Sequence, residues 1–278
     1  MIPTRSRVVP ASLAALVVLP VLAACSGGGD EGASRGRRGG GERRGEAVRG
    51  AGGGAGPGDS STGRGATGAG GPLAAQRPPS PCADPAPGRP ACPVVLFLGT
   101  SLTAGLGVEP EEAYPARIQE KLDSAGLRWR AVNGGVSGET SAGALRRLEW
   151  MLRPGVLVLV VETGANDGLR GLDVDSTRAN LRAIVRRARA FDSGLGIVLA
   201  GMEAPPNLGA AYTARFRAMY GDLARRERLA LIPFILQGVG GVDSLNQADG
   251  IHPTPQGHAI IAATVWRVLE RVLRTVGQ

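Results

Sequence analysis

Five short apolar runs constrain the fold of this chain more than any other feature. They occupy residues 94–99, 129–133, 156–162, 196–201 and 229–234. Several of them are continuous, with little polar alternation, which is typical of strands covered on both faces in a parallel sheet. Segments with helical periodicity lie between and after the runs, at residues 113–125, 141–152, 175–191, 212–228 and 256–276. This alternation predicts an α/β protein, a three-layer α/β/α sandwich around a five-stranded parallel sheet.

The loops that follow the strands are expected to lie along one edge of this sheet. Right-handed crossovers bring the carboxyl ends of parallel strands to the same side, and open sheets of this kind build ligand sites there. The folded part, residues 91–278, has a normal size for one domain with a full hydrophobic core. We therefore expect the functional residues of a single domain in these loops.

Residues 1–24 have the organisation of an export signal. Arg5 and Arg7 precede an apolar run at residues 8–24 that ends in small side chains. This is the order of charge, core and cleavage site in a secretory peptide. The run is short for a membrane-spanning helix and contains Pro10 and Pro20. We therefore expect an exported protein rather than one held by a transmembrane helix.

The residues that end at Cys25 resemble the lipobox of bacterial lipoproteins. They read LAAC, and the resemblance implies cleavage before Cys25 and attachment of a diacylglycerol to its sulfur. The protein would then be anchored by lipid to a membrane of the cell envelope, on its periplasmic or extracellular face. The alternative is an ordinary secreted protein in which Cys25 is incidental.

Residues 25–90 differ in composition from the segments on either side. They are rich in Gly, Arg and Pro, lack aromatic side chains, and show neither helical nor strand periodicity. Such a segment buries too little apolar surface to offset its ordering entropy, which predicts a flexible tether. The formal net charge of +8 is spread along the chain, and an exported chain seldom meets nucleic acid. We therefore expect no nucleic-acid partner.

Cys82 and Cys92 flank the proline-rich stretch ADPAPGRPA. In the oxidising compartment that export implies, a local disulfide between them is expected at the entrance of the folded domain. Two free thiols are the alternative, because the sequence does not give the Cα–Cα distance on which a disulfide depends.

The loop after the first apolar run contains Ser101, in GTSLTAG. A serine at a strand-to-helix junction lies over backbone N–H groups that stabilise developing negative charge. Taken alone, such a serine is more often a helix N-cap. Two other matches to nucleophile patterns, at residues 32–36 and 58–61, lie in the tether with no strand before them and no helix behind, so they are discarded.

Three further loops contribute complementary groups. Gly138 follows the second run and lets a backbone N–H approach a substrate, although a plain turn explains it as well. Asn166 follows the third run and has an amide that can donate to an oxyanion or form an Asx turn. In DGIH, Asp249 can orient one ring nitrogen of His252 while the other takes a proton from Ser101, although a lone histidine is more often structural. The four loops together supply a nucleophile, a base, an orienting acid and oxyanion donors.

In this order and spacing, the four loops resemble the sequence blocks of the SGNH/GDSL hydrolases, especially the bacterial branch of thioesterases, arylesterases and lysophospholipases. The resemblance covers residues 95–274, with the blocks written here as GTSL, SGETS, GAND and DGIHP. It implies a flavodoxin-like SGNH hydrolase fold with Ser101 as the nucleophile, His252 as general base and acid, and Asp249 as the third triad member. It also implies an oxyanion hole made by the Ser101 and Gly138 N–H groups and the Asn166 amide.

One residue departs from the family pattern. Thr100 stands where the family usually has Asp, but that carboxylate is not a triad member and a threonine hydroxyl can still bond locally. The change bears on the rigidity of the loop and on the rate, not on the assignment. Two other polar residues receive no catalytic role: Glu162 is expected to be buried and hydrogen-bonded, and His258 is expected to be a surface or packing residue.

The activity expected from these residues is that of a serine esterase, which hydrolyses carboxylic ester or thioester bonds through an acyl-enzyme. The expected partners are small acyl esters, thioesters or lysophospholipids, and the expected form is a monomer. Leu169, Met202 and Pro205 are expected to border the acyl side, which favours an apolar acyl group over a sugar. No metal or cofactor is implied, because the chain has 2 histidines, no His-Glu-x-x-His motif, and no phosphate loop around its single lysine, Lys121.

Two other functions stay open at this point. One is an O-acetyl esterase of cell-envelope polysaccharide, which a tethered domain would suit and which should fail on acyl groups longer than butyryl. The other is a non-catalytic envelope binding lipoprotein on a hydrolase-like scaffold, which the intact set of proposed site residues argues against. Acyl-length preference tests the first alternative, and labelling by a fluorophosphonate probe tests the second.

Overall fold

The computed structural model describes Cys82 and residues 91–276. The expected signal peptide at residues 1–24, the expected lipidation site Cys25 and the rest of the expected tether up to residue 90 lie outside the described residues. The interpretations of those segments therefore stay predictions.

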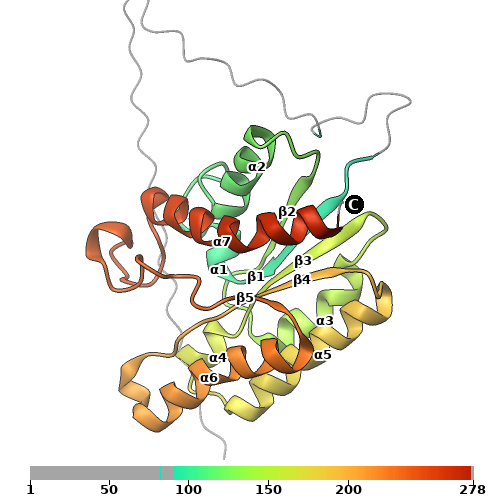
Figure 1. The fold of residues 1–278 in the computed structure, drawn as a ribbon. Helices are drawn as coiled ribbons and strands as arrows, with labels where there is room; N and C mark the ends of the chain where they lie inside the picture. The colour runs from blue at the N-terminus through green and yellow to red at the C-terminus, as the bar shows by residue number, and fades with distance from the viewer. Residues whose placement is uncertain (1–81, 83–90, 277–278) are drawn as a thin grey trace, which may run out of the picture. The chain divides into compact units, whose positions relative to one another are not determined.

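The predicted parallel sheet is present, and its five strands have the order β2-β1-β3-β4-β5 (Figure 1). The strands are β1 (Val94–Gly99), β2 (Arg130–Gly135), β3 (Val156–Glu162), β4 (Gly196–Ala200) and β5 (Ala230–Ile232). All neighbouring strands are parallel, and the order is that of flavodoxin-like folds. β1 is buried along its whole length and β3 at all but one position, because both lie inside the sheet between two helical layers.

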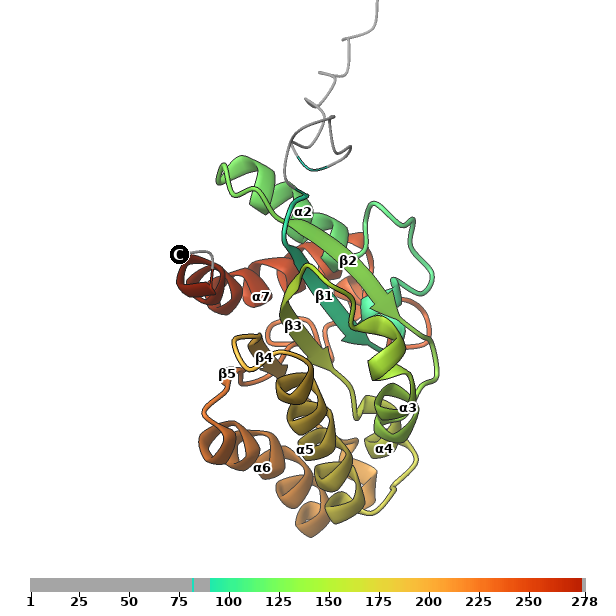
Figure 2. The same cartoon turned by 90° about the vertical axis from the view of Figure 1, so that its right-hand side faces the viewer.

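Helices cover both faces of the sheet (Figures 1 and 2). One layer contains α2 (Tyr114–Ser124) and α7 (Pro255–Val276); the other contains α3 (Ser141–Met151), α5 (Val174–Phe191) and α6 (Ala210–Glu227). The apolar residues that gave α5 its periodicity, Leu181, Ile184, Val185 and Ala188, are all buried. The three-layer α/β/α architecture is therefore confirmed. None of the helices in the described part of the chain is both long and apolar enough to cross a membrane.

The observed elements differ from the expected ones mainly at their ends. β5 stops at Ile232 because Pro233, the next residue, has no N–H to donate to the ladder. Four short elements have no counterpart in the sequence analysis: α1 (Ser101–Ala104), α4 (Ala165–Leu169) and the 3₁₀ turns η1 (Pro206–Leu208) and η2 (Asp243–Leu245). They are too short to produce a periodic apolar pattern, and all of them lie in loops that follow strands.

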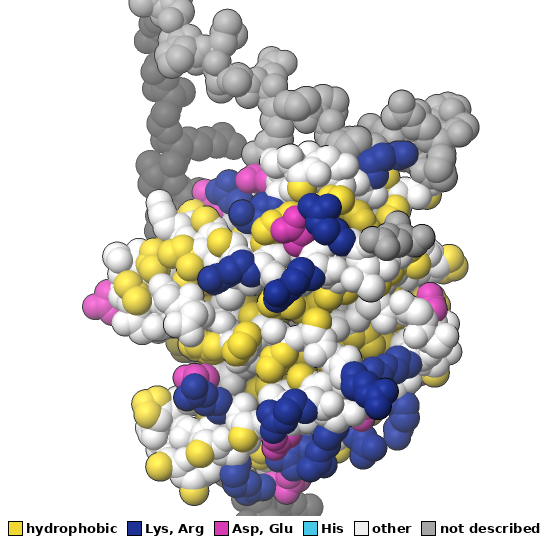
Figure 3. Space-filling model, in the orientation of Figure 1, with side chains coloured by type: hydrophobic (Ala, Val, Ile, Leu, Met, Phe, Trp, Pro, Cys, Tyr) yellow, Lys and Arg dark blue, Asp and Glu magenta, His cyan; other side chains and the backbone are white. Residues whose placement is uncertain are grey.

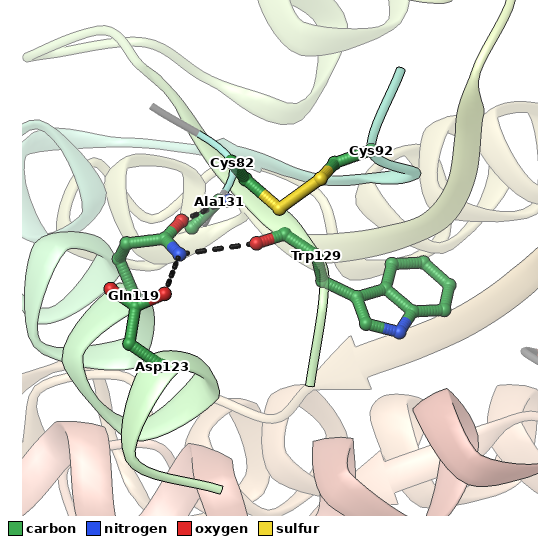
Figure 4. Close-up of a disulfide and its surroundings, with 6 residues drawn as sticks. All are labelled: Cys82, Cys92, Gln119, Asp123, Trp129 and Ala131. Atoms are coloured by element: carbon green, nitrogen blue, oxygen red, sulfur yellow. Dashed lines mark hydrogen bonds between the residues drawn. A yellow bond between two sulfur atoms is a disulfide. The ribbon is translucent and has the colours of Figure 1, made fainter. Parts of the chain in front are cut away.

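Cys82 and Cys92 form the disulfide that the sequence favoured, with Cα atoms 5.8 Å apart. The bond lies beside Gln119 of α2 and the beginning of β2 (Figure 4). The Gln119 side chain donates to the Trp129 carbonyl at 3.1 Å and accepts from the Ala131 N–H at 2.8 Å, so α2 is tied to β2 at this point. The disulfide therefore fixes the chain at the place where it enters the domain, two residues before β1.

Candidate active site

Ser101 is the first residue of α1 and follows β1 directly. Its backbone N–H belongs to the first turn of a helix, where N–H groups have no intrahelical acceptor, and no described residue accepts from it. The hydroxyl-bearing side chain is half-buried at the carboxyl edge of the sheet. α1 is short because Gly105, with φ +77°, takes a left-handed conformation at its end. The strand-to-helix turn thus presents both the hydroxyl and an N–H of one residue at this edge.

His252 and Asp249 lie next to this serine, although 151 residues separate His252 from Ser101 in the sequence. The distance from His252 Nε2 to Ser101 Oγ is 2.9 Å, and the distance from His252 Nδ1 to Asp249 Oδ2 is 2.6 Å. A carboxylate only accepts hydrogen bonds, so the Nδ1–H donates to Asp249 and Nε2 is left to accept from Ser101. The three side chains therefore form one continuous hydrogen-bonded line.

Asp249 also organises the backbone of its own loop. Its Oδ1 accepts the N–H groups of Ile251 at 2.9 Å and His252 at 3.0 Å. The hydrogen bonds from His252, side chain first, and from the Ile251 backbone hold the pKa of Asp249 well below its usual range. The carboxylate is thus ionised wherever the domain is folded at neutral pH, and its position relative to the imidazole ring is fixed by several bonds.

Gln247 joins this loop to the loop after α1, a role that the sequence analysis missed. Its backbone N–H donates to the His252 carbonyl at 2.7 Å. Its side-chain amide donates to the carbonyls of Leu106, at 2.7 Å, and Pro253, at 3.0 Å. Gly107 makes room for it, because a Cβ there would come within 2.1 Å of the Gln247 side-chain oxygen. One amide therefore bridges the loops that present the serine and the histidine.

Gly138 and Asn166 lie beside the serine in the same cavity. Gly138 has φ +75° and open space where a Cβ would be, a conformation that favours glycine. No described residue accepts from its N–H. The Asn166 side-chain amide donates one hydrogen to the Glu139 carbonyl at 3.0 Å, which leaves its second N–H available. The structure therefore brings together every residue of the proposed triad and oxyanion hole.

Two buried or half-buried carboxylates hold the loops of Gly138 and Asn166 in place, and neither was singled out from the sequence. Glu139 forms a bidentate pair with Arg147, at 2.8 and 2.7 Å. Arg147 also donates to the carbonyl of Gly99 at the end of β1. Asp167 of α4 accepts from the Ser141 N–H at 2.8 Å and hydroxyl at 2.6 Å. The oxyanion loops are thus braced against α3 and β1 by charge-assisted bonds.

Thr100 and Glu162 form a buried contact immediately behind Ser101. The Glu162 carboxylate accepts the Thr100 N–H at 2.9 Å and its hydroxyl at 3.0 Å, and also the Thr103 hydroxyl at 2.7 Å. Burial raises the pKa of Glu162, an effect that these donors oppose. The expectation that Glu162 is buried and hydrogen-bonded is confirmed, and so is the local bonding expected of the Thr100 hydroxyl.

His258 is a packing residue. It is buried at the start of α7, where its ring stacks on Tyr114 and its Nδ1 accepts the Tyr114 N–H at 3.3 Å. Burial lowers the pKa of His258 to about 4, so the ring is neutral at neutral pH. This histidine therefore contributes to packing behind the site and is not at the surface, the other position that the sequence left open.

An apolar cavity of about 320 Å³ opens beside the proposed nucleophile. Leu169 and Met202 line it, as expected, but Pro205 does not; it lies farther along the loop, directly before η1. Leu106, Leu236 and Ile251 also line the cavity and were missed. Leu106 and Ile251 are each 45% exposed, but apolar residues in loops carry no periodic signal that would reveal such exposure from sequence.

No group of three or more His, Cys, Asp or Glu side chains in the described part of the chain is arranged to hold a metal ion. The polar residues that line the cavity include Ser101, His252, Gly138 and Asn166, which offer a hydroxyl, an imidazole and amide donors, and one carboxylate, Glu203, which pairs with Arg217. A doubly wound five-stranded sheet that presents these groups on loops at its carboxyl edge defines the chain as an SGNH-type α/β hydrolase.

Comparison with known protein families gives the same class. Residues 97–260 match the GDSL-like Lipase/Acylhydrolase family. The match spans more than half of the chain, and the chain belongs to this family.

Similar proteins of known name are esterases and thioesterases. The esterase TesA of Pseudomonas aeruginosa is 40% identical over 184 residues, which is 66% of this chain and 90% of that protein. An arylesterase of Vibrio mimicus is 34% identical over 64% of this chain and 89% of its own length. Thioesterase 1/protease 1/lysophospholipase L1 of Escherichia coli is 34% identical, covering 62% of this chain and 81% of the relative.

Solved structures agree with these relatives. A crystal structure of TesA superposes with a TM-score of 0.62 at 39% identity, over 64% of this chain and 99% of that one. AlinE4, an SGNH-hydrolase family esterase, gives a TM-score of 0.55 at 37% identity, over 66% of this chain and 98% of its own. The predicted SGNH hydrolase fold is therefore confirmed.

Proposed function

We propose that this protein is a serine esterase that hydrolyses carboxylic ester or thioester bonds of acyl substrates, with Ser101 as its nucleophile. The observation that carries the proposal is the line from Asp249 Oδ2 through His252 to Ser101 Oγ, with hydrogen bonds of 2.6 and 2.9 Å. Membership of the GDSL-like Lipase/Acylhydrolase family supports the same reaction class.

Acylation follows from the positions of these atoms. The Ser101 hydroxyl attacks the acyl carbon while His252 Nε2 takes its proton, and Asp249 stabilises the imidazolium that forms. The negative oxygen of the tetrahedral intermediate accepts hydrogen bonds from the Ser101 and Gly138 N–H groups and from the second N–H of Asn166. As the intermediate collapses, the imidazolium donates its proton to the leaving alkoxide or thiolate, which departs as an alcohol or thiol.

Deacylation repeats these steps with water. His252 Nε2 accepts a proton from a water molecule, whose oxygen attacks the acyl carbon of the Ser101 ester. Collapse of the second tetrahedral intermediate breaks the bond to Ser101 Oγ, which recovers its proton from the imidazolium. The acyl group leaves as a carboxylic acid, and the residues return to their starting protonation states.

The lining of the cavity supports an apolar acyl group as the recognised part of the substrate. Its walls are mostly aliphatic, with side chains from several loops, namely Leu102, Leu106, Leu169, Met202, Leu236 and Ile251. A sugar would leave its hydroxyl groups without partners against such walls. The names of the relatives, which include an arylesterase and a thioesterase 1/protease 1/lysophospholipase L1, support small acyl esters, thioesters or lysophospholipids as substrates.

The deciding experiment is hydrolysis of p-nitrophenyl acyl esters by Ser101→Ala, run beside Ser124→Ala as a matched control. Ser124 ends α2 and only donates to the Glu120 carbonyl, so its variant should keep wild-type turnover. The Ser101 variant should lose turnover and labelling by a fluorophosphonate probe. Wild-type turnover in the Ser101 variant would end the proposal, and a chain that neither turns over nor labels would instead be a binding protein.

We also propose that the protein is exported and anchored to an envelope membrane through a lipid on Cys25. The basic and apolar order of residues 1–24 and the LAAC sequence support this proposal. Cys25→Ser should move the protein from the detergent-extracted membrane fraction to the soluble fraction, and unchanged fractionation would exclude the lipid anchor. The proposed form is a monomer, because one chain supplies the whole cavity; light scattering of the purified protein tests it.

A further inference from the structure

The edge of the sheet at which the strands begin, called here the amino edge, is strongly basic. Arginines are spread along the sequence, but the fold brings many of them close to the beginnings of strands and toward the C-terminal ends of helices. Those without an acidic partner are Arg128, Arg130, Arg153, Arg186, Arg226, Arg228 and Arg271. All of them are exposed, and none forms an ion pair with a described residue.

The opposite edge, which holds the proposed active site, has the opposite charge character. Every loop that follows a strand contains at least one acidic residue, and Arg170 is the one basic residue among them. On the face shown in Figure 3, Lys and Arg side chains lie over α5 and α6 and also over α7, with some Asp and Glu side chains among them. Charge is therefore distributed unevenly between the two edges of the sheet: the amino edge is basic, and the edge that holds the cavity is acidic.

Exposed aromatic side chains lie among these arginines. Trp150, one residue before the end of α3, is 70% exposed, and the Arg153 guanidinium lies 5.6 Å from the centre of its ring. Phe191 ends α5, the helix packed against α3, and is 45% exposed. Arginines at helix C-termini are explained by the helix dipole, but an exposed tryptophan is not. Tryptophan beside arginine is typical of surfaces that meet the headgroup region of a bilayer.

A groove of about 340 Å³ on the same edge suits a lipid headgroup. Arg228 and Arg271 line it together with Arg189, which pairs with Glu227, and with aliphatic residues at the beginnings of β4 and β5 and on α7, among them Ile197 and Val272. Arg228 has φ +50° at the end of α6, a conformation that helix ends usually give to Gly or Asn. A groove with two unpaired guanidinium groups above an apolar floor fits a phosphodiester and the glycerol carbons attached to it.

The chain itself enters the domain at this edge. β1 begins at Val94, and the disulfide to Cys82 fixes Cys92 just before it. Figure 2 shows the strands along their length, with the beginning of β1 near the top of the domain. The first strand of the domain therefore begins at the basic, aromatic edge.

We propose that the amino edge is a docking surface for a bilayer that contains anionic phospholipids. Trp150 and Phe191 enter the headgroup region, and the arginines, Arg228 and Arg271 in particular, bind lipid phosphates. The cavity beside Ser101 then faces away from the bilayer, at the far end of the strands. A protein docked in this way takes substrate from the aqueous side rather than from the membrane on which it lies.

The test measures vesicle binding without the contribution of a lipid anchor. The processed chain, residues 25–278 with Cys25→Ser, is sedimented with vesicles of phosphatidylcholine containing phosphatidylglycerol, or of phosphatidylcholine alone. Arg228→Gln with Arg271→Gln should weaken binding to the anionic vesicles by roughly five-fold for each arginine removed. The matched control, Arg178→Gln with Arg215→Gln, removes the same charge from the beginnings of α5 and α6 and should bind like the parent.

The tether arginines are common to all of these variants, so they do not produce the difference between them. All four substitutions lie outside the proposed active site, and unchanged hydrolysis of p-nitrophenyl esters shows that each variant is folded. Equal vesicle binding by the two double variants would overturn the proposal.

Tryptophan fluorescence tests whether Trp150 contacts the bilayer. Vesicles with brominated acyl chains should quench the emission of the parent chain, and Trp150→Phe should abolish most of this quenching, since Trp129 is buried and Trp266 half-buried. Absence of quenching in the parent would contradict a membrane contact. If the arginine variants also lost binding to heparin while Trp150 stayed unquenched, the amino edge would be a surface for soluble polyanions and the proposal would fail.

Discussion

Thr100 donates two hydrogen bonds to Glu162, from its N–H at 2.9 Å and from its hydroxyl at 3.0 Å, in a fully buried contact directly before Ser101. SGNH hydrolases usually have Asp at the position of Thr100. A second carboxylate beside Glu162 would have to share a proton with it, because two adjacent buried carboxylates do not both ionise. The threonine hydroxyl supplies a donor instead, so the contact holds the first turn of α1 without that requirement.

Glu162→Gln is expected to destabilise the domain and slow catalysis. An amide offers one acceptor oxygen and two donors, so at least one donor from Thr100 or Thr103 loses its acceptor. The free energy of unfolding should fall by about 1–3 kcal/mol, and kcat should fall while KM changes little, because the cavity walls are untouched. Urea unfolding and steady-state kinetics measure both effects.

Glu270→Gln is the matched control for that variant. Glu270 pairs with Arg274 on the surface of α7, and loss of an exposed pair should change stability by less than about 1 kcal/mol. Equal stability and equal kcat in the two variants would show that the buried contact does not support the serine.

His258 should make the domain less stable as the pH falls below neutral. Its pKa is about 4 in the folded state and about 6.5 when unfolded, so the unfolded chain binds the proton first. The contribution of this residue to the free energy of unfolding is complete above pH ~6.5 and is lost as the pH falls to 4 and below, by roughly 3 kcal/mol in all.

Urea unfolding of His258→Gln at pH 7 and pH 4 tests this expectation. Glutamine keeps an acceptor for the Tyr114 N–H but does not titrate. The carboxylates of the domain titrate equally in both proteins, so the difference between the two pH dependences isolates the histidine. The wild type should lose more stability than the variant between the two pH values; parallel curves would mean that burial does not keep this ring neutral.

Asp249→Asn should abolish most of the activity with little effect on the fold. The side-chain oxygen of asparagine can still accept hydrogen bonds from the Ile251 and His252 backbone N–H groups. The charged oxygen that accepts from His252 Nδ1–H is then replaced by an NH2 group, which cannot accept a hydrogen bond. The ring then loses both its orientation and the stabilisation of its protonated form, and kcat should fall roughly 10³–10⁴-fold. Asp243→Asn, in η2 of the same loop, is the control and should keep wild-type kcat. A loss of less than tenfold in the Asp249 variant would remove it from the proposed triad.

The fold was predictable because its strands carry a strong local signal. Residues 156–162 form an uninterrupted apolar run, and β3 takes those bounds because both of its faces are covered. The short helix α4 was not predictable, since five residues give no apolar period, and its first turn carries Asn166. The end of β5 depended on one residue, Pro233, whose missing N–H outweighs the apolar character of the run.

The proposed site residues were predictable because each occupies a loop after a strand, and parallel topology brings those loops to one edge. What holds them was not, because the pairs are formed by the fold alone. Gln247 meets Leu106 across 141 residues and Glu162 meets Thr100 across 62. No spacing rule links such positions in one sequence. The expectation that Pro205 borders the cavity was wrong for the same reason, since local composition does not determine the direction that a loop takes after its strand.

Leu169→Trp should shorten the acyl group that the enzyme prefers. Leu169 ends α4, lines the cavity and is 45% exposed, so an indole can be accommodated without disturbing the core. It would fill part of the space beside Ser101. Activity on long-chain p-nitrophenyl esters should fall at least tenfold relative to acetyl and butyryl esters, because an overpacked pocket rejects the added methylenes.

Leu172→Trp makes the same change three residues away. Leu172 is 41% exposed and does not line the cavity, so its variant should keep the wild-type acyl profile. The ratio of kcat/KM for long and short esters, measured for all three proteins, separates an effect on the cavity from an effect of the added ring. Identical profiles would place the acyl group elsewhere. If the wild-type enzyme hydrolysed acetyl esters alone, the O-acetyl esterase would be favoured over an esterase of longer acyl groups. The aliphatic wall formed by Leu169 and its neighbours would then contact no acyl carbon beyond the two of an acetyl group.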